Sequence, residues 1–438
     1  MRELLRHRDF RLILAGQSLS MFGDWTLLLV FGIWGKSLTG SNAIAGLMIF
    51  AMAGPGLLGP LGGLLADRVR RRHLMVTLNV LSAGAVLLLW FVHDRDQLWL
   101  LFAVAAWYGL SGVVFDAAIS GLVQALLPAP LIGPANGSLT TVRQGLRLIG
   151  PLVGAGLFTT VGGGWVATLD ALTFLLSAAL LLRLRAPEGR PERTATPFRT
   201  EVSAGLVHLV RAPLLRHLSV VTAICGAAFG LIEATVFAVV DTGLHQPPVF
   251  VGVVVSAEGV GALVGGVAVT IAIHRLPETA LVITGQALAA IGIGVLITAT
   301  LPTVLIGAAL LGAALPIINV AALTLLQHTT PNPLMGRVTA AFDLANTVPY
   351  TISIALGAVL VTALPYQAVL GLVVTGCTLA ALYATLTLRV RTPRPARTEP
   401  PVAKRGPNGK RAAEKGLPRS AAHTQDRCRW PGPFVVGE

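Results

Sequence analysis

Apolar stretches of roughly twenty residues recur along almost the whole chain. An α-helix of about 20 apolar residues spans the hydrocarbon core of a bilayer, and in lipid each such segment must satisfy its own backbone hydrogen bonds. The twelve stretches are 10–34, 43–66, 73–93, 98–124, 137–161, 165–185, 214–240, 249–273, 279–300, 302–327, 336–362 and 366–389. Only 12% of the residues are charged, against about 25% in a soluble domain. We therefore predict an all-α membrane protein with twelve transmembrane helices.

The positive charges fall on one side of this arrangement. With twelve spans, both termini share a side, and all of the 33 Lys and Arg residues except Lys36 and Arg95 belong to it. Because cytoplasmic loops carry the Lys and Arg excess, we place both termini in the cytoplasm and the protein in the inner (plasma) membrane. The net charge of +13 is thus explained by topology, and we expect no nucleic-acid partner.

The longest connection, 186–213, divides the spans into an N-terminal half (1–185) and a C-terminal half (214–391). Its second half has apolar residues at helical spacing, which predicts a short amphipathic helix on the inner membrane surface. These residues are Val202, Leu206, Leu209 and Val210. The tail 392–438 is basic and rich in Pro and Gly, and we expect it to be disordered. Attraction to anionic lipid and a solvated tail with no role are equally good interpretations of its charge.

Two six-helix halves joined by a cytoplasmic loop are typical of transporters whose halves rock about a site near the membrane midplane. Such motion needs interfaces at which helices approach closely. The stretch "GPLVGAG" contains Gly150, Pro151 and Gly154, with its glycines at the spacing that permits tight helix contact in lipid. Static packing is the alternative explanation for these glycines.

The loop after the second span, "GGLLADRVRRR", resembles the loop 2–3 signature of the major facilitator superfamily. The matching residues are Gly63, Leu65, Ala66, Asp67, Arg68, Arg71 and Arg72, and Arg70 stands where the family has a second glycine. The D-R-x-x-R-R pattern resembles the enterobactin-exporter and macrolide-efflux branch. So do "RDFRLILAGQSLSMFGDW", "ANGSLTTVRQGLRLIGPLVGAGL" and "LLQHTTPNPLMGRVTA". The resemblance covers residues 1–390 and implies the major facilitator fold and an export function.

Six acidic residues lie inside the predicted spans: Asp24, Asp116, Asp170, Glu233, Glu258 and Asp343. A charge there costs at least about 2.5–3.5 kcal/mol, which favours a functional role. The sequence places no Lys or Arg at mid-depth, so we expect that ion pairs do not neutralise all of these acids. Since burial disfavours the charged form, some of them should carry a proton, as a proton-coupled carrier requires.

Asp24, near the middle of the first span and beside Trp25, is the first candidate for binding a proton or substrate; a buried structural carboxyl is the alternative. The resemblance makes Glu233 its counterpart, because helices 1 and 7 of the family line the same cavity. Glu258 lies among the glycines of the eighth span and is a further candidate. Asp170 is close to the outer start of its helix, where we expect it to be solvated.

Arg143 and Arg147 share one face of the fifth span. We predict that they line an inner vestibule and attract an anionic substrate. Snorkelling to the interface and pairing with Asp116 are the structural alternatives.

By the resemblance, Asp67 faces the start of the eleventh helix, which suggests a charged latch that closes the inner gate and breaks when the halves rock. The residues of this predicted latch are Asp67, Arg68, Arg71, Arg72, Asp116 and Asp343. The helix N-terminus would stabilise the Asp67 carboxylate by about 0.3–1 kcal/mol.

We therefore expect a monomeric secondary transporter, in contact with membrane lipid, that exports an amphipathic small molecule such as a drug, macrolide or siderophore in exchange for protons. We expect no metal and no cofactor, with the proton gradient as energy source. The sequence contains no phosphate-binding loop of an ATP-driven pump and no nucleophile–base grouping. One alternative is uptake or facilitated flow of a metabolite or lysolipid; a remote one is a transporter-like sensor or membrane enzyme.

Overall fold

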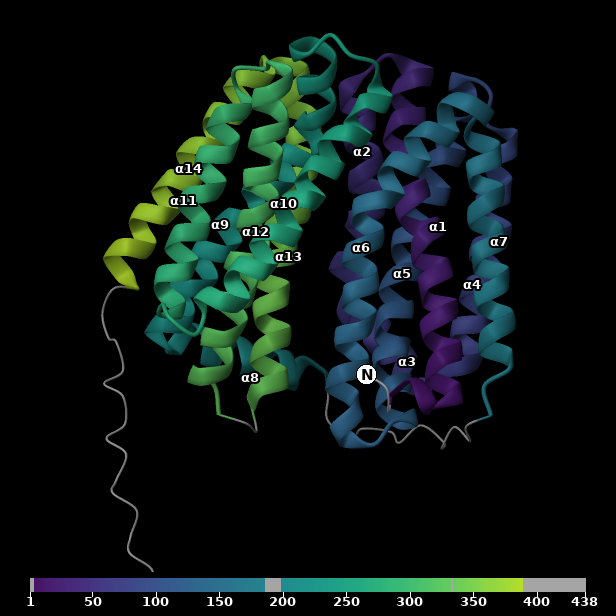
Figure 1. Ribbon diagram of the computed structural model, residues 1–438, viewed down its shortest axis with the longest axis horizontal. Coiled ribbons are helices and arrows are strands. Elements are labelled where there is room, and N and C mark those ends of the chain that lie inside the picture. Colours follow the sequence, from purple (N-terminus) through teal and green to yellow (C-terminus); the bar gives the residue numbers. More distant parts are fainter. Residues whose placement is uncertain (1–3, 186–197, 332–333, 389–438) are drawn as a thin grey trace, which may run out of the picture. The chain divides into compact units, whose positions relative to one another are not determined.

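The computed structural model describes residues 4–185, 198–331 and 334–388, and in these ranges it consists of helices and their connections (Figure 1). Ten helical segments are long and apolar enough to cross a membrane. The other two predicted spans, 43–66 and 137–161, are also helical, so the prediction of an all-α membrane fold is confirmed. The continuous helices are α1 (Arg8–Thr39), α4 (Arg71–Leu87), α5 (Leu98–Leu126), α6 (Ala129–Val161), α7 (Gly163–Leu182), α9 (Pro213–Ala238), α10 (Val251–Ala272), α11 (Glu278–Leu296), α12 (Leu301–Thr329), α13 (Met335–Ala363) and α14 (Tyr366–Thr387).

The second span is broken into three pieces, α2 (Asn42–Ala53), the 3-10 turn η2 (Gly54–Leu58) and α3 (Gly59–Arg68). The side chain of Ser41 caps α2 by accepting a hydrogen bond from the backbone N–H of Ile44. Both η2 and α3 have a proline in their first two positions, and proline lacks the N–H that would continue the preceding α-helix. The prolines therefore divide a stretch that hydropathy alone reads as one helix.

Helix α6 begins at Ala129, whereas the sequence prediction started it at 137. The added turns contain Pro130, Gly133 and Pro134, residue types that disfavour a helix, so the sequence did not indicate that the helix starts this early. In the linker, where the sequence predicts a short amphipathic helix on the membrane surface, the structure has the helix α8 (Phe198–Arg211). It packs against α13 with Leu209 buried, while Leu206 and Val210 are exposed. The first half of the linker and the tail from 392 lie outside the described residues.

Helices α1–α7 form the N-terminal half and α9–α14 the C-terminal half (Figure 1). The two halves meet through equivalent helices: α2 packs against α13, and α6 packs against α10. Each contact joins the second span of one half to the fifth span of the other. The interface therefore follows the internal pseudo-symmetry expected of two related six-helix halves.

Small residues line both of these contacts. A Cβ atom on Gly46 of α2 would lie 3.0 Å from the Cβ atoms of Ala234 and Ala358. A Cβ atom on Gly252 of α10 would lie 3.0 Å from the Cβ of Ala155 and 3.1 Å from the carbonyl oxygen of Pro151. Close backbone approach without bulky side chains is how helices associate in lipid.

Gly150 and Gly154 serve a different contact, the packing of α6 on α1 inside the N-terminal half. A Cβ on Gly150 would lie 2.4 Å from the Cβ of Trp25, and one on Gly154 would lie 2.0 Å from the carbonyl oxygen of Thr26. The static-packing explanation therefore accounts for these two glycines, while Pro151 lies at the contact with α10.

We predict that Gly154→Ala lowers the free energy of unfolding by about 1–3 kcal/mol, because the added methyl group forces α6 away from α1. Gly156→Ala is the matched control, since nothing lies within 4 Å of its hypothetical Cβ. Thermal unfolding of both purified variants in detergent measures the difference. Equal stability of the two variants would contradict the close contact of α6 with α1.

Candidate functional site

A cavity of about 440 Å³ lies among α1, α2, α4, α5 and α6 and also receives Glu233 from α9 and Tyr350 from α13. We call it the central cavity. Six of the predicted site residues line it, namely Asp24, Trp25, Asp116, Arg143, Arg147 and Glu233. A smaller adjoining cavity of about 110 Å³ shares Trp25, Arg147 and Glu233 with it and adds Glu258. The structure thus brings the predicted binding and vestibule residues together around one space lined by both halves.

In the N-terminal half, Asp24 is held by Tyr108 of α5, whose hydroxyl donates a hydrogen bond to Oδ1 of Asp24. The ring of Tyr108 is fixed between Phe31 of α1, at a centroid distance of 5.9 Å, and Phe174 of α7, at 6.0 Å. The sequence analysis did not single out Tyr108. Its position resembles that of many other aromatic residues in apolar runs, so only the fold reveals it.

The prediction that Asp170 is solvated is wrong, because its side chain is fully buried. It lies about two turns into α7, facing Gly23 of α1, where a Cβ atom would come within 2.1 Å of the Asp170 carboxyl. Gly23 therefore makes the room for this carboxyl. The hydroxyl of Thr173 donates to the Asp170 backbone carbonyl at 2.7 Å and contacts its Oδ1 at 3.3 Å.

An ion pair crosses between the halves. Nη2 of Arg147 on α6 lies 2.9 Å from Oε1 of Glu258 on α10, and the two side chains are 27% and 22% exposed. The guanidinium carbon of Arg147 also lies 5.7 Å from the ring centroid of Trp25, a cation–π distance. Because Arg147 lies near the centre of α6, the expectation that no cation reaches mid-depth is wrong. Neither alternative for Arg147, snorkelling or pairing with Asp116, describes this arrangement.

For Arg143 the structure has the alternative of pairing with Asp116. Nη2 of Arg143 lies 2.9 Å from Oδ1 of Asp116 on α5. Both side chains are substantially exposed, at 44% and 59%. In the C-terminal half, Glu233 is partly buried and interacts with Tyr350 of α13. Asp116 and Glu258 thus each form an ion pair with an arginine, whereas Asp24 and Glu233 form none among the described residues, although Arg147 lies close enough to Glu233 to act on its charge.

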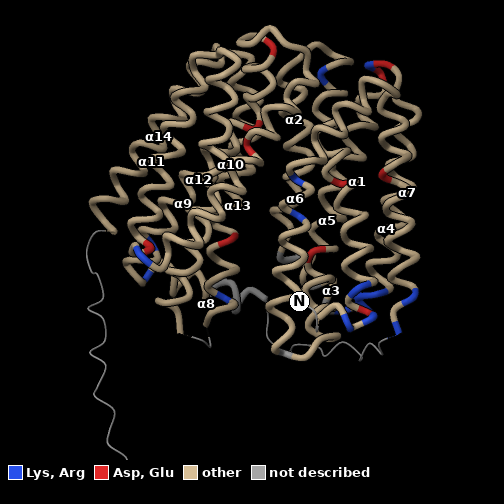
Figure 2. The backbone as a smooth tube through the Cα atoms, in the orientation of Figure 1, with Lys and Arg blue, Asp and Glu red and all other residues tan. Residues whose placement is uncertain are grey.

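The arginines of the predicted latch belong to α3 and α4, at the end of the N-terminal half where Figure 2 shows Lys and Arg residues gathered. Arg71 donates to the carbonyl of Gly121 at 2.9 Å, and Arg72 donates to that of Leu181 at 3.0 Å, both within the N-terminal half. Arg68 and Asp343 are exposed. The side chain of Asp67 lies outside the description, so the latch between the halves stays a prediction.

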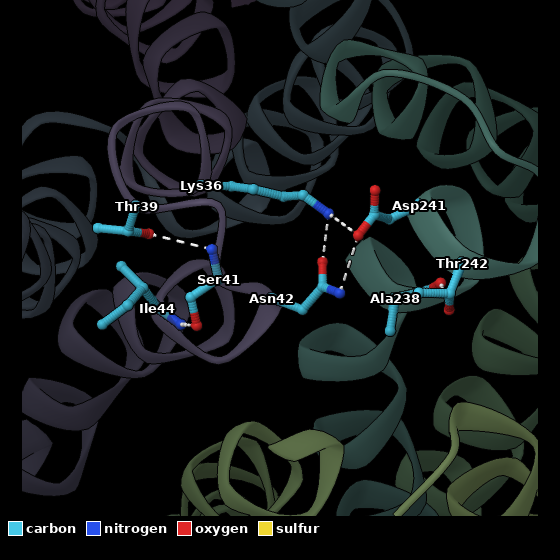
Figure 3. A network of polar contacts seen from close by, with 8 residues as sticks. All are labelled: Lys36, Thr39, Ser41, Asn42, Ile44, Ala238, Asp241 and Thr242. Carbon is cyan, nitrogen blue, oxygen red and sulfur yellow. Dashed lines mark hydrogen bonds and ion pairs between the residues drawn. The ribbon is translucent and has the colours of Figure 1, made fainter.

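At the opposite end, a polar network joins the halves (Figure 3). Nζ of Lys36 lies 2.7 Å from Oδ2 of Asp241, which belongs to the π-helical turn η5 (Val239–Gly243) after α9. Asn42 at the start of α2 accepts from Lys36 and donates to Asp241 at 3.2 Å. Lys36 is only 5% exposed and Asp241 40%. The sequence marked Lys36 only as one of two cations on this side.

Comparison with known proteins agrees with this architecture. The family model described as Major Facilitator Superfamily matches residues 13–240 and 218–427. The MFS-type transporter YfiS of Bacillus subtilis (strain 168) is 26% identical over 364 residues, covering 80% of this chain and 85% of that protein.

Two named exporters are also similar. The enterobactin exporter EntS of Citrobacter koseri is 27% identical over 333 residues, covering 73% of this chain and 74% of EntS. The multidrug efflux pump Tap of Mycobacterium tuberculosis (strain H37Rv) is 28% identical over 307 residues, covering 66% of this chain and 71% of Tap.

Among solved structures, a bacterial homologue of the iron transporter ferroportin in an inward-facing state superposes with a TM-score of 0.68 at 17% identity. The match covers 86% of this chain and 98% of that chain, and shows a common fold. Two six-helix halves around a shared cavity, and a family model that matches most of the chain, lead to one conclusion: the chain belongs to the Major Facilitator Superfamily of membrane transporters.

Proposed function

We propose that the protein exports an amphipathic small molecule across the inner membrane by proton antiport and alternating access. The observation that carries this proposal is the central cavity, which both halves line and which contains two carboxyls, Asp24 and Glu233, that form no ion pair among the described residues. A site shared by both halves can be exposed to either side when the halves rock. Carboxyls that gain and lose a proton supply the coupling.

The lining of the cavity fits an amphipathic substrate. Apolar and aromatic side chains such as Met21, Met52, Phe115 and Phe174 supply most of its surface, beside the carboxyls and the two arginines. Ligand sites of this type use apolar walls for affinity and a few polar groups for orientation. Flexible methionines allow such walls to adapt to ligands of different shape.

The contacts between the halves support alternating access. The Lys36–Asn42–Asp241 network joins them at one end. Toward the arginine-rich end, Asp116 and Arg143 at the cavity wall remain substantially exposed. We assign the arginine-rich end, and both termini, to the cytoplasm on the basis of the charge asymmetry. The arrangement then corresponds to a carrier open to the cytoplasm, ready to load a substrate for export.

The direction of transport is inferred from the relatives. EntS is named as an exporter of enterobactin and Tap as a multidrug efflux pump. A strain that lacks the gene, screened against drugs and siderophores, should accumulate at least one compound to a higher level than the parent strain. Lower accumulation would indicate uptake instead, and turnover of a compound without translocation would indicate an enzyme.

The Lys36–Asn42–Asp241 network lies at the end of the protein opposite the cytoplasm. Breaking it should favour the state in which the cavity opens to this non-cytoplasmic side. A cysteine placed at Ile49, in the cavity wall, reports on this opening. We predict that Lys36→Met raises its labelling rate from the non-cytoplasmic side at least about five-fold, equivalent to about 1 kcal/mol. An impermeant thiol reagent applied to oriented vesicles measures this rate in a cysteine-free background. Arg95→Met is the control, because Arg95 bonds the carbonyls of Leu38 and Thr39 within one half. Equal rates in both variants would exclude the network as a gate.

A further inference from the structure

We propose that Asp170, buried behind the cavity wall, is a second proton-binding residue of the transport cycle and shares a proton with Asp24 through the hydroxyl of Tyr108. The proposal rests on the proposed proton coupling and locates it in the N-terminal half. It assigns a function to a carboxyl that does not line the central cavity.

Three residues from three helices form this group, which we call the Asp24–Tyr108–Asp170 relay. Tyr108 of α5 donates its hydroxyl proton to Oδ1 of Asp24 on α1. Its ring lies 6.0 Å from that of Phe174, one turn after Asp170 on α7, and Asp170 itself faces Gly23, the residue before Asp24. Asp24 lines the central cavity, Tyr108 lines it as well, and Asp170 is fully buried. The relay therefore leads from the substrate space into the interior of the half.

Proton counting shows why the relay can move a proton. A tyrosine hydroxyl has one proton, so it donates to only one carboxyl at a time. While it donates to Asp24, a hydrogen bond with Asp170 requires that Asp170 supply the proton. If Tyr108 passes its proton to Asp24 and takes one from Asp170, Asp24 becomes neutral and Asp170 becomes charged. Two O–H bonds break, two form, and the number of protons is unchanged.

Among the described residues, no cation faces Asp170 that would hold it permanently ionised. The helices packed on α7 are α1, α4 and α6 together with the 3-10 turn η3 (Leu88–Phe91). From α1 only Asp24 faces it, and η3 has no titratable residue. Arg72 of α4 bonds Leu181 at the far end of α7. The arginines of α6 are paired with Asp116 and Glu258 in the cavity.

One carboxyl oxygen of Asp170, Oδ2, is buried and has no hydrogen-bond partner among the described residues. An ionised carboxylate buried in this way is costly, so the group favours states in which it holds a proton. In the relay, Asp170 holds a proton while Asp24 is charged and releases it when Asp24 is neutral. This role explains why a carboxyl is buried at this position.

Infrared spectroscopy of the purified protein tests the shared proton without any substrate. The carboxyl C=O bands are recorded against pH for the wild type, Asp24→Asn, Asp170→Asn and the double variant. Coupled carboxyls titrate as a pair, so Asp170→Asn should displace the titration midpoint of Asp24 by about one pH unit or more. Asp343→Asn is the control, because Asp343 is exposed on α13 in the other half and should only subtract an independent band.

Tyr108→Phe keeps the ring packing and removes the bridge, so in this background Asp24→Asn should no longer displace the titration midpoint of Asp170. This comparison tests the relay even if Asp170→Asn fails to fold. Strictly additive spectra of the single and double variants, or an equal displacement with and without the Tyr108 hydroxyl, would overturn the relay.

Transport measurements separate the relay from the proposed function. Gradient-driven efflux in proteoliposomes should fall at least about tenfold in Asp170→Asn. Full proton-driven efflux in this variant would overturn the role of Asp170 while the antiport proposal stands. A second outcome is that the infrared titrations are coupled but efflux by the wild type does not depend on the proton gradient. This outcome would overturn antiport and, with it, the role of Asp170 in transport.

Discussion

Asp24→Asn should reduce export driven by a proton gradient at least about tenfold, equivalent to ~1.4 kcal/mol or more, because asparagine cannot take up and release a proton. The amide is the same size as the carboxyl and can still accept the Tyr108 hydrogen bond, so the packing of α1 is preserved. Net efflux and substrate exchange are measured in proteoliposomes. Exchange without a gradient should persist, because it needs no change in protonation.

The companion variant Glu233→Gln removes the matching carboxyl of the C-terminal half. Comparison of the two shows which carboxyl couples to protons and which binds substrate, since loss of substrate binding lowers exchange as well. Full gradient-driven export by the double variant Asp24→Asn/Glu233→Gln would refute proton coupling through the cavity carboxyls.

Glu258→Gln should lower transport by about 10- to 100-fold, because it leaves the Arg147 guanidinium partly buried at the interface of the halves without its counter-charge. The pair is about three-quarters buried, so its loss should matter more than that of an exposed ion pair. Transport rate and thermal stability are measured together. Glu278→Gln is the matched control, because its partner His328 belongs to the same half and is 66% exposed.

Exchanging the two charges distinguishes a bridge from a substrate contact. In the variant Arg147→Glu/Glu258→Arg the pair can form again with reversed polarity. Recovery of at least about half of the wild-type rate, a difference of ~0.4 kcal/mol, would indicate that the pair mainly joins the halves. Failure of the exchange, with the single variants stable, would indicate that the guanidinium must stay on α6, next to Trp25.

The fold was predictable because each span has to be apolar over its whole length, whatever it packs against. What hydropathy could not show is where a helix departs from that rule. The break at η2 depends on backbone chemistry, and the first turns of α6 contain Pro130, Gly133 and Pro134, which sequence patterns associate with helix ends. The linker helix α8 was visible in its periodicity, but its packing on α13 was not.

The site was predictable in part, for a similar reason. Acids within apolar spans are costly, so Asp24, Glu233 and Glu258 stood out by composition alone. The residues that these acids pair with could not be identified from composition. Arg147 and Glu258 are 111 residues apart in the chain, and their pairing depends on the packing of α6 on α10. The burial of Asp170 depends on Gly23, where a missing side chain leaves space for the carboxyl.

The central claim is that a proton moving inward through this protein drives a small molecule outward. The most direct test measures transport of a compound identified in the deletion-strain screen into everted vesicles, with and without an imposed proton gradient. The account predicts accumulation that requires the gradient, collapses when a protonophore is added, and is lost in Asp24→Asn. Equal accumulation with and without the gradient would contradict it.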